Sequence, residues 1–411
     1  MKEKPIVEMI PLKNAVRKDA PTELAVLVRI VAPQRETARE RPQLNLGLVL
    51  DRSGSMGGAK LRAVKDAAKY AVQQLRATDR VAVIIYDSEV ETIVPSVLAS
   101  EKTGIIRKIN GIECGGATAL HDGWVEGGMQ VSRHLDTKSL NRVLLLTDGL
   151  ANHGETNVDR ICSDVKGLAS RGVSTTTMGV GNDFNEDLLQ AMSQSGDGNY
   201  YFIEGAGDLE RIFAGELRGL MATVGHTVSL GIEPQSGSEV VDVMNDLERN
   251  KLGRLQLPNL VAGNAIEVVV KLQVPAQSVE RDVCFVRLAW SVPDSAQRFV
   301  VREALSLPSV SSGEWDALPE NERVADAVAL LEAARIRQQA VEELERGDIV
   351  AARSSFSRGR SLAGNIKDGA AAAEEAALFE VLDGDFDKGE HAHLSKLAKS
   401  HNYKRRRSQS D

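Results

Sequence analysis

From residue 44 to residue 224 the sequence alternates between two hydrophobic periods, and this alternation restricts the fold more than any other feature. Short, almost continuously apolar runs such as 44–50 (LNLGLVL) and 142–146 (RVLLL) are typical of buried strands. Intervening stretches such as 58–76 repeat apolar residues every three or four positions, as one face of a helix does. Strands that alternate with helices predict an α/β fold with a doubly wound, mostly parallel sheet covered on both faces.

The same two periods assign the other elements of this region, which we take as one domain over residues 44–224. Further strands are predicted at 80–86, 91–94, 173–179 and 200–203, and helices at 103–110, 121–135, 158–170, 186–194 and 208–224. The run at 91–94 is expected to form a hairpin with the strand before it.

After residue 225 the pattern changes to a period of two, interrupted by Gly, Pro and Asn. Six short strands are predicted, at 226–232, 239–243, 253–256, 265–274, 283–291 and 299–305, so residues 225–310 are expected to form a β-sandwich. Residues 1–43 contain a strand at 23–32 followed by a charged linker with Pro33 and Pro42. That strand is a candidate seventh strand of the sandwich, which would make the α/β domain an insertion.

The last part of the chain is rich in Ala, Glu and Arg and is expected to be helical. Four helices forming a bundle over 319–400 are predicted at 322–345, 349–362, 369–382 and 389–400. Residues 401–411, which include the KRRR cluster, are expected to be a disordered basic tail.

Composition excludes several classes of function. The chain has 58 acidic and 50 basic residues, a net charge of −8, which argues against a nucleic-acid partner. Only 3 Trp, 5 Tyr and 8 Phe are present, too few to suggest a stacking platform for single strands. No apolar run approaches 18 residues and the start lacks the apolar core of a secretory signal, so no membrane span is expected. Three scattered cysteines favour a reducing, cytoplasmic location, and the oligomeric state stays open.

Polar residues with converging oxygens follow the first strand of the α/β region. Asp51, Ser53 and Ser55 are spaced by two in a turn that Gly54 allows to bend sharply. The turn lies at the carboxyl end of a strand, where open α/β sheets bind their ligands. One carboxylate and two hydroxyls are hard oxygen ligands that suit Mg²⁺, with Mn²⁺ or Ca²⁺ as alternatives.

Two later loops add matching oxygens. Thr118 ends the glycine-rich loop 115–118 (GGAT), and Asp148 follows the strand at 142–146 within the sequence TDG. The carboxyl ends of parallel strands share one edge of the sheet, so these residues are expected to lie near Asp51. The sequence therefore predicts one metal centre made of Asp51, Ser53, Ser55, Thr118 and Asp148.

This ordered set of DxSxS, a later Thr in a Gly-rich loop and a TDG aspartate closely resembles the von Willebrand factor A domain. The resemblance implies that the five residues form a metal-ion-dependent adhesion site, in which a protein partner's Asp or Glu carboxylate completes the metal shell. It covers about 44–224. More loosely, the order of later strands and helices resembles bacterial von Willebrand A proteins and inter-alpha-trypsin inhibitor heavy chains. The implied function is a non-enzymatic, metal-dependent protein-interaction module.

The same residues are also compatible with other functions. The DxSxS turn also suits a metal-free helix N-cap. A metal-dependent hydrolase would use the same ion as a Lewis acid, although no general base or phosphate-binding Lys or Arg falls at a recognisable spacing in the three loops. An accessory subunit of an AAA-type ATPase is a special case of the interaction module. Neighbouring polar residues are expected to have structural or solvent roles: Asp87, Ser88, Glu89, Cys114, His121, Asp122, Asn152, His153 and Glu155.

Overall fold

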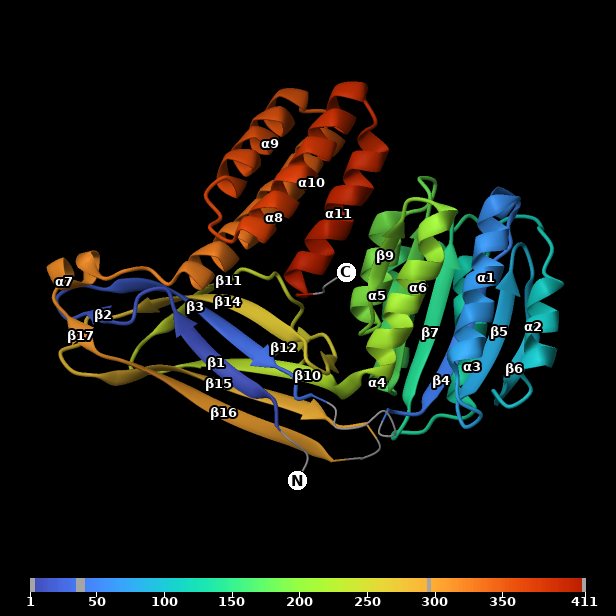
Figure 1. The fold of residues 1–411 in the computed structure, drawn as a ribbon, viewed down its shortest axis with the longest axis horizontal. Helices are drawn as coiled ribbons and strands as arrows, with labels where there is room; N and C mark the ends of the chain where they lie inside the picture. Colours follow the sequence, from blue (N-terminus) through green and yellow to red (C-terminus); the bar gives the residue numbers. More distant parts are fainter. Residues whose placement is uncertain (1–3, 35–40, 294–296, 409–411) are drawn as a thin grey trace. The chain divides into compact units, whose positions relative to one another are not determined.

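The computed structural model describes residues 4–34, 41–293 and 297–408 (Figure 1). Within these residues the chain forms two compact units. One is an α/β unit that spans 41–224 and also includes 292–293 and 297, and the other combines 4–34, 225–291 and 298–408. The α/β unit is therefore inserted between parts of the second unit. The predicted linker lies partly, and the last three residues of the predicted tail entirely, outside the described residues.

A six-stranded sheet forms the centre of the α/β unit, with the order β6-β5-β4-β7-β8-β9. All neighbouring strands are parallel except β6, which pairs with β5 in an antiparallel hairpin. This confirms the doubly wound, mostly parallel fold. The strands are β4 (Leu44–Asp51), β5 (Arg80–Tyr86), β6 (Val90–Leu98), β7 (Leu140–Thr147), β8 (Val173–Val180) and β9 (Tyr200–Ile203).

Helices cover both faces of this sheet (Figure 1). They are α1 (Ala59–Gln74), α2 (Lys102–Asn110), α3 (Leu120–Ser132), α4 (Val158–Ser170), α5 (Glu186–Ser195) and α6 (Ala206–Met221). Successive side chains of β4 alternate between the two faces of the sheet. On one face, Leu48 belongs to the core that includes residues of α1, α2 and α6. On the other face Val49 touches α3 so closely that a Cβ on Gly127 would lie 2.3 Å from it.

Two antiparallel sheets build the second unit, with the orders β1-β3-β14-β11 and β12-β10-β15-β16, and β13 pairs with β10. The N-terminal strand β3 pairs along its whole length with β14, from Thr22↔Val274 to Val31↔Ala265. The strands are β1 (Ile6–Pro11), β2 (Val16–Arg17), β3 (Thr22–Val31), β10 (Thr223–Pro234), β11 (Glu239–Val243), β12 (Leu255–Leu257), β13 (Leu260–Val261), β14 (Ala265–Val274), β15 (Arg281–Ser291), β16 (Arg298–Leu307) and β17 (Ser309–Val310).

The helical segment packs on this β part. Val324 and Leu331 of α8 share a core with Leu27 of β3, and Arg335 of α8 binds Asp242 of β11 at 2.5 Å. The helices are α7 (Ser312–Ala317), α8 (Glu322–Glu345), α9 (Ile349–Ala363), α10 (Gly369–Lys388) and α11 (His391–Arg406).

The C-terminal helices are longer than the sequence suggested. Helix α10 continues past Gly384 because Phe386 remains buried, with its ring 5.9 Å from that of Phe356. Helix α11 extends to Arg406, so residues 401–406 are helical where we predicted a disordered tail. The reason is that Asn402 and Tyr403 are buried, and Asn402 accepts a hydrogen bond from the buried Arg337.

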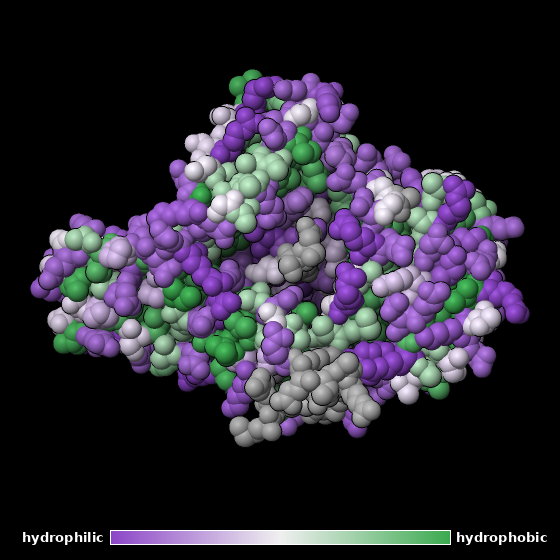
Figure 2. Space-filling view, in the orientation of Figure 1, coloured by the Kyte–Doolittle hydropathy of each residue, from purple (hydrophilic) through white to green (hydrophobic). Residues whose placement is uncertain are grey.

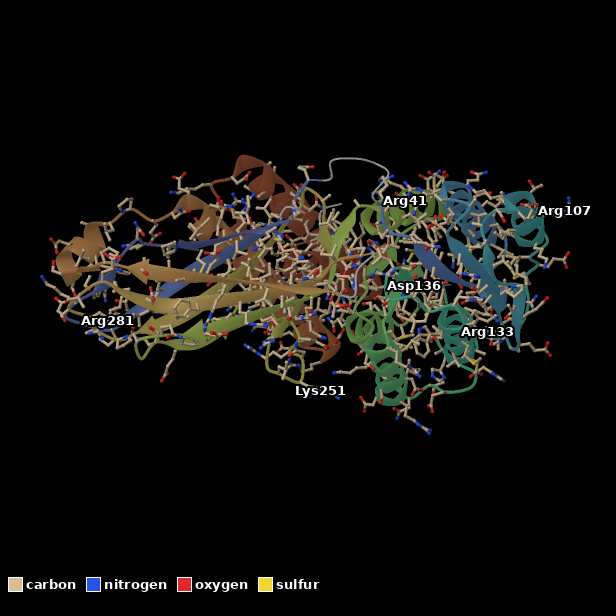
Figure 3. All side chains as sticks on the ribbon, turned by 90° about the horizontal axis from the view of Figure 1, so that it is seen from below. Arg41, Arg107, Arg133, Asp136, Lys251 and Arg281 are labelled. Atoms are coloured by element: carbon tan, nitrogen blue, oxygen red, sulfur yellow. The ribbon has the colours of Figure 1, made fainter. Side chains whose placement is uncertain are left out.

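The surface of each unit is mostly polar. Figure 2 shows hydrophilic residues over most of the visible face, with apolar residues in small separate groups. Charged side chains such as Arg107 of α2, Lys251 and Arg281 of β15 lie exposed on the outside (Figure 3). Among the described residues, no helix combines the length and apolarity needed to cross a membrane.

Candidate metal centre

Two neighbouring strands bring the predicted carboxylates together. Strands β4 and β7 run parallel with Leu50 opposite Leu146, so Asp51 at the end of β4 and Asp148 just beyond β7 emerge at the same sheet edge. Both aspartates are fully buried. This placement follows from the parallel direction of the two strands, which puts their carboxyl ends at the same edge of the sheet.

The loop after β4 folds around the carboxylate of Asp51. Its Oδ1 accepts the backbone N–H of Ser53 at 2.8 Å, and its Oδ2 accepts the hydroxyl of Thr147 at 2.6 Å. A short 3₁₀ turn, Gly54–Met56, then reverses the chain, anchored by Met56 in the core. The hydrogen-bond partners of Asp51, which also include the Tyr86 hydroxyl, are neutral groups.

The side-chain oxygens of Ser53, Ser55 and Asp148 lie next to one another in space. The hydroxyl oxygens of Ser53 and Ser55 are 3.2 Å apart, and Ser55 donates to Oδ1 of Asp148 at 2.7 Å. The other oxygen of Asp148 accepts a hydrogen bond from Nζ of Lys60 at 2.5 Å. The sequence did not suggest Lys60, which lies in the first turn of α1 and carries a cation into the site.

Thr118 faces the same cluster from the glycine-rich loop. A Cβ on Gly149 would lie 3.3 Å from Oγ1 of Thr118 and 3.7 Å from Oγ of Ser55, so both hydroxyls line one side of this glycine. The backbone N–H of Thr118 donates to Oδ1 of Asn152 at 2.9 Å. Asn152 therefore positions the threonine loop, a role that its place in a polar stretch did not reveal.

Asp87, predicted only as part of the β5–β6 turn, also fastens the glycine-rich loop. Its Oδ2 accepts the backbone N–H of Gly116 at 3.2 Å and lies 3.1 Å from Nε of Arg52. A side chain at Gly115 would collide with this carboxylate, which explains the glycine. Burial opposes the ionised form, but the N–H groups of Glu89 and Gly116 and the Arg52 guanidinium hold the pKa of Asp87 below its usual value.

The electrostatics of the cluster favour a cation. Burial raises the pKa of Asp51, the nearby charge of Asp148 adds to this, and the hydrogen bonds from Thr147 and Ser53 act against it. A buried carboxylate held only by neutral donors lacks a compensating positive charge. Since the donors offered are carboxylate and hydroxyl oxygens, the residues fit a hard divalent cation.

Other polar neighbours serve the framework. His121 lies 3.1 Å from Asp164 and stacks on Trp124, which ties α3 to α4. Asp122 lies beside Gly154, where a Cβ would be 2.8 Å from its Oδ2, and the φ of +73° at this glycine also disfavours a side chain. Cys114 donates its thiol to the carbonyl of Ser53 at 3.0 Å, so it contacts the DxSxS loop rather than simply filling space.

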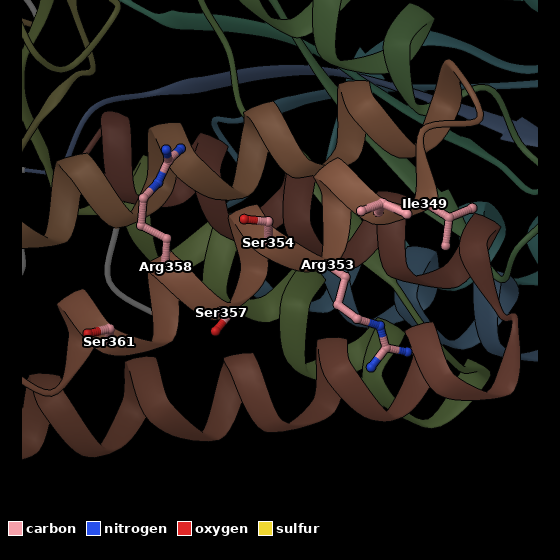
Figure 4. Close-up of a pocket in the computed structure, with 7 residues that line it drawn as sticks. Ile349, Arg353, Ser354, Ser357, Arg358 and Ser361 are labelled. Atoms are coloured by element: carbon pink, nitrogen blue, oxygen red, sulfur yellow. The ribbon is translucent and has the colours of Figure 1, made fainter.

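Two features of the helical segment lie outside this centre. The ligand atoms of Asp385, Glu390 and His393 lie within 4.8 Å of one another. His393 bonds Asp385 at 2.7 Å directly after the left-handed cap at Gly389, so this cluster closes the α10–α11 turn. A surface hollow on α9 (Figure 4) is lined by Ile349, Val350, Arg353, Ser354, Ser357, Arg358 and Ser361, with no carboxylate for a cation.

Comparison with known proteins places the site in a family context. Residues 45–215 match the model of the von Willebrand factor type A domain. The uncharacterized protein YfbK of Escherichia coli K12 is 31% identical over 208 residues, which are 50% of this chain and 36% of that protein. The uncharacterized protein sll0103 of Synechocystis is 28% identical over 62% of this chain and 68% of that protein. Human inter-alpha-trypsin inhibitor heavy chain H2 is 26% identical over 46% of this chain.

Solved structures extend the likeness in fold over nearly the whole chain. A von Willebrand factor type A protein from Catenulispora acidiphila has a TM-score of 0.73 at 16% identity and covers 96% of both chains. The ArnB paralog VWA2 from Sulfolobus acidocaldarius has a TM-score of 0.63 at 16% identity, over 97% of this chain and 98% of that one. By contrast, the match spans only about a third of the length of YfbK and 21% of heavy chain H2.

Proposed function

Residues 45–215 are a von Willebrand factor type A domain, and we propose that they act as a non-enzymatic, divalent-metal-dependent protein-interaction module. The ligands assigned to the metal are Asp51, Ser53, Ser55, Thr118 and Asp148, and the metal is Mg²⁺, with Mn²⁺ or Ca²⁺ as substitutes. The observation that carries this proposal is the continuous series of oxygens from Ser53 through Ser55 to Asp148, at 3.2 and 2.7 Å.

The partner's chemistry follows from the donor set. Mg²⁺ prefers six oxygen ligands, and five protein groups leave at least one position for water or a partner. When bound, the metal supplies a directional attraction for an anionic oxygen. We therefore propose that the partner is a protein that presents an Asp or Glu carboxylate. The glycine-rich loop and the loop after β7, whose Asn152 holds it, lie beside the site and would contact the rest of that partner.

The test measures metal binding and capture of partners together. Isothermal titration with Mg²⁺ and Mn²⁺ compares wild type with Asp51→Ala, Asp148→Ala and Asp148→Asn. Asp66→Asn, an exposed change on α1, is the control. We expect the site variants to lose metal affinity at least tenfold while keeping the circular dichroism of the wild type. We also expect pull-downs in Mg²⁺ to recover proteins that are lost in EDTA. Partners kept equally by Asp148→Ala and in EDTA would refute the metal bridge.

A phosphatase assay distinguishes the interaction module from the alternative of a metal-dependent hydrolase. Lys60 provides a cation at the site, but it is bonded to Asp148 at 2.5 Å. We expect the Mg²⁺-saturated protein to leave p-nitrophenyl phosphate unhydrolysed, and turnover that Asp148→Ala abolishes would overturn the non-enzymatic assignment. A role as an ATPase accessory subunit would appear as an ATPase among the Mg²⁺-dependent partners. The cytoplasmic location remains part of the proposal and is supported by the small number of cysteines, three in 411 residues.

A further inference from the structure

Lys60 brings a positive charge into contact with one of the proposed metal ligands. Its Nζ lies 2.5 Å from Oδ2 of Asp148, and the aspartate is fully buried whereas the lysine side chain is 28% exposed. The same nitrogen lies 4.0 Å from Oδ2 of Asp183, a carboxylate that is 77% exposed in the loop between β8 and α5. Lys60 therefore has one buried and one exposed acidic neighbour.

The fold leaves room for this lysine. The loop after β8 begins at Gly181 with a φ of +74°, and a Cβ there would lie 3.4 Å from Nζ of Lys60 and 3.5 Å from its Cε. Glycine at this position allows the positive φ, and because it has no side chain it leaves space for the side chain of Lys60. Asp148 does not depend on Lys60 alone, because Ser55 holds its other oxygen at 2.7 Å.

The charges at the centre lead to a specific consequence. Asp51 and Asp148 contribute two negative charges and Lys60 one positive charge, so the three groups sum to −1. A divalent cation would change this sum to +1 with Lys60 present and to zero without it. We propose that Lys60 is a built-in counter-charge that weakens metal binding but keeps the metal-bound site positive, and so strengthens its hold on an anionic group. This inference rests on the proposed metal site and adds the source of its preference for carboxylates.

A purely structural role for Lys60 predicts the opposite sign. If the lysine only positioned Asp148, its removal would loosen that ligand and weaken metal binding. If it acts as a counter-charge, its removal takes away repulsion between two cations and tightens metal binding. In a partly exposed site we expect the gain to be about tenfold in affinity at low ionic strength, falling as salt is added.

The variants test the charge of Lys60 separately from its size, and they distinguish an effect at the metal site from an effect on helix α1. Lys60→Met and Lys60→Gln remove the charge, and Lys60→Arg retains it. Lys69→Met is the matched control, because Lys69 lies on the same helix with 26% exposure and pairs with the exposed Asp66. Circular dichroism and thermal melts without metal check that each variant folds.

The experiment titrates Mn²⁺ by its effect on water-proton relaxation and then titrates acetate, as the minimal carboxylate, into the Mn²⁺-saturated protein. We expect Lys60→Met and Lys60→Gln to bind Mn²⁺ about tenfold more tightly and acetate several-fold more weakly than wild type. Lys60→Arg and Lys69→Met should match wild type in both. Equal or weaker Mn²⁺ binding by Lys60→Met, or unchanged acetate binding, overturns the inference but leaves the metal site intact. Failure of the wild type itself to bind Mn²⁺ refutes the proposed function and this inference with it.

Discussion

A buried ion pair joins β7 to α6 in the α/β unit and permits a quantitative test. Arg142 and Glu216 have side chains only 4% and 2% exposed, with Nη1 of the arginine 2.8 Å from Oε1 of the glutamate. The same Oε1 accepts the hydroxyl of Thr176 at 2.8 Å. The second oxygen, Oε2, accepts Nδ2 of Asn199 at 2.7 Å and the hydroxyl of Tyr201 at 2.8 Å. The glutamate is therefore satisfied on both oxygens.

Glu216→Gln keeps the shape of the side chain but leaves the Arg142 guanidinium charged and buried without its counter-ion. Removing one partner of a buried pair costs about 3–5 kcal/mol of unfolding free energy. For a domain of this size each kcal/mol moves the melting temperature by roughly 2–4 °C, so the melting temperature of the α/β unit should fall by at least about 6 °C. Arg142→Met combined with Glu216→Gln should recover part of this loss, because no charge remains buried.

Differential scanning calorimetry over a range of pH values measures the effect. Burial opposes the ionised form of Glu216, but Arg142 and the three donors outweigh it and lower the pKa of the folded state. The stabilisation is therefore present above the unfolded pKa of about 4.3 and is lost as pH falls through the lower folded pKa, so the two proteins should converge in acid. Asp208→Asn, which breaks an exposed pair, should cost under about 0.5 kcal/mol. A loss below about 1 kcal/mol for Glu216→Gln at pH 7 would refute the reasoning.

Two further predictions concern packing and thiol chemistry. Gly123→Ala on α3 places a Cβ 2.7 Å from the ring of Tyr86 and should cost about 1–3 kcal/mol in urea unfolding, whereas Gly167→Ala on α4, where nothing lies within 4 Å, should be neutral or stabilising. Ellman's reagent at pH 8 should modify the exposed Cys114 quickly, whereas burial raises the pKa of Cys284 to about 11 and should protect it until denaturant is added; equal rates would contradict this.

Individual strands and helices could be predicted from the sequence where the hydrophobic periodicity was uninterrupted. The strand predicted at 80–86 coincides with β5, because every residue from Val81 to Tyr86 is buried and the apolar run has clear ends. Prediction was wrong where tertiary contacts overrode local signals. The helix predicted at 369–382 continues as α10 to Lys388, because Phe386 is buried. The polar sequence 401–406 likewise folds as helix because Asn402 meets the buried Arg337.

The candidate site also contains residues that the sequence predicted and residues that it did not. Its five proposed ligands carry sequence signals of their own, since each follows a strand or a glycine-rich turn. The residues that shape the site carry none. Asp87 contacts Gly116 from 29 positions away, and Lys60 reaches Asp148 from 88 positions away. The tertiary arrangement of the loops creates these contacts, so a pattern along the sequence does not reveal them.

The loops of the site are joined to one another by hydrogen bonds. The N–H of Gly54 donates to the carbonyl of Gly116 at 3.0 Å, and the N–H of Gly115 donates to the carbonyl of Arg52 at 2.7 Å, so the first and second loops are joined through their backbones. Ser55 and Asp148 join the first loop to the third. A scaffold fixed in this way should keep its fold when metal is removed, and metal should raise the melting temperature only by mass action on the folded state. The stabilisation should therefore grow with the logarithm of Mg²⁺ concentration above the dissociation constant.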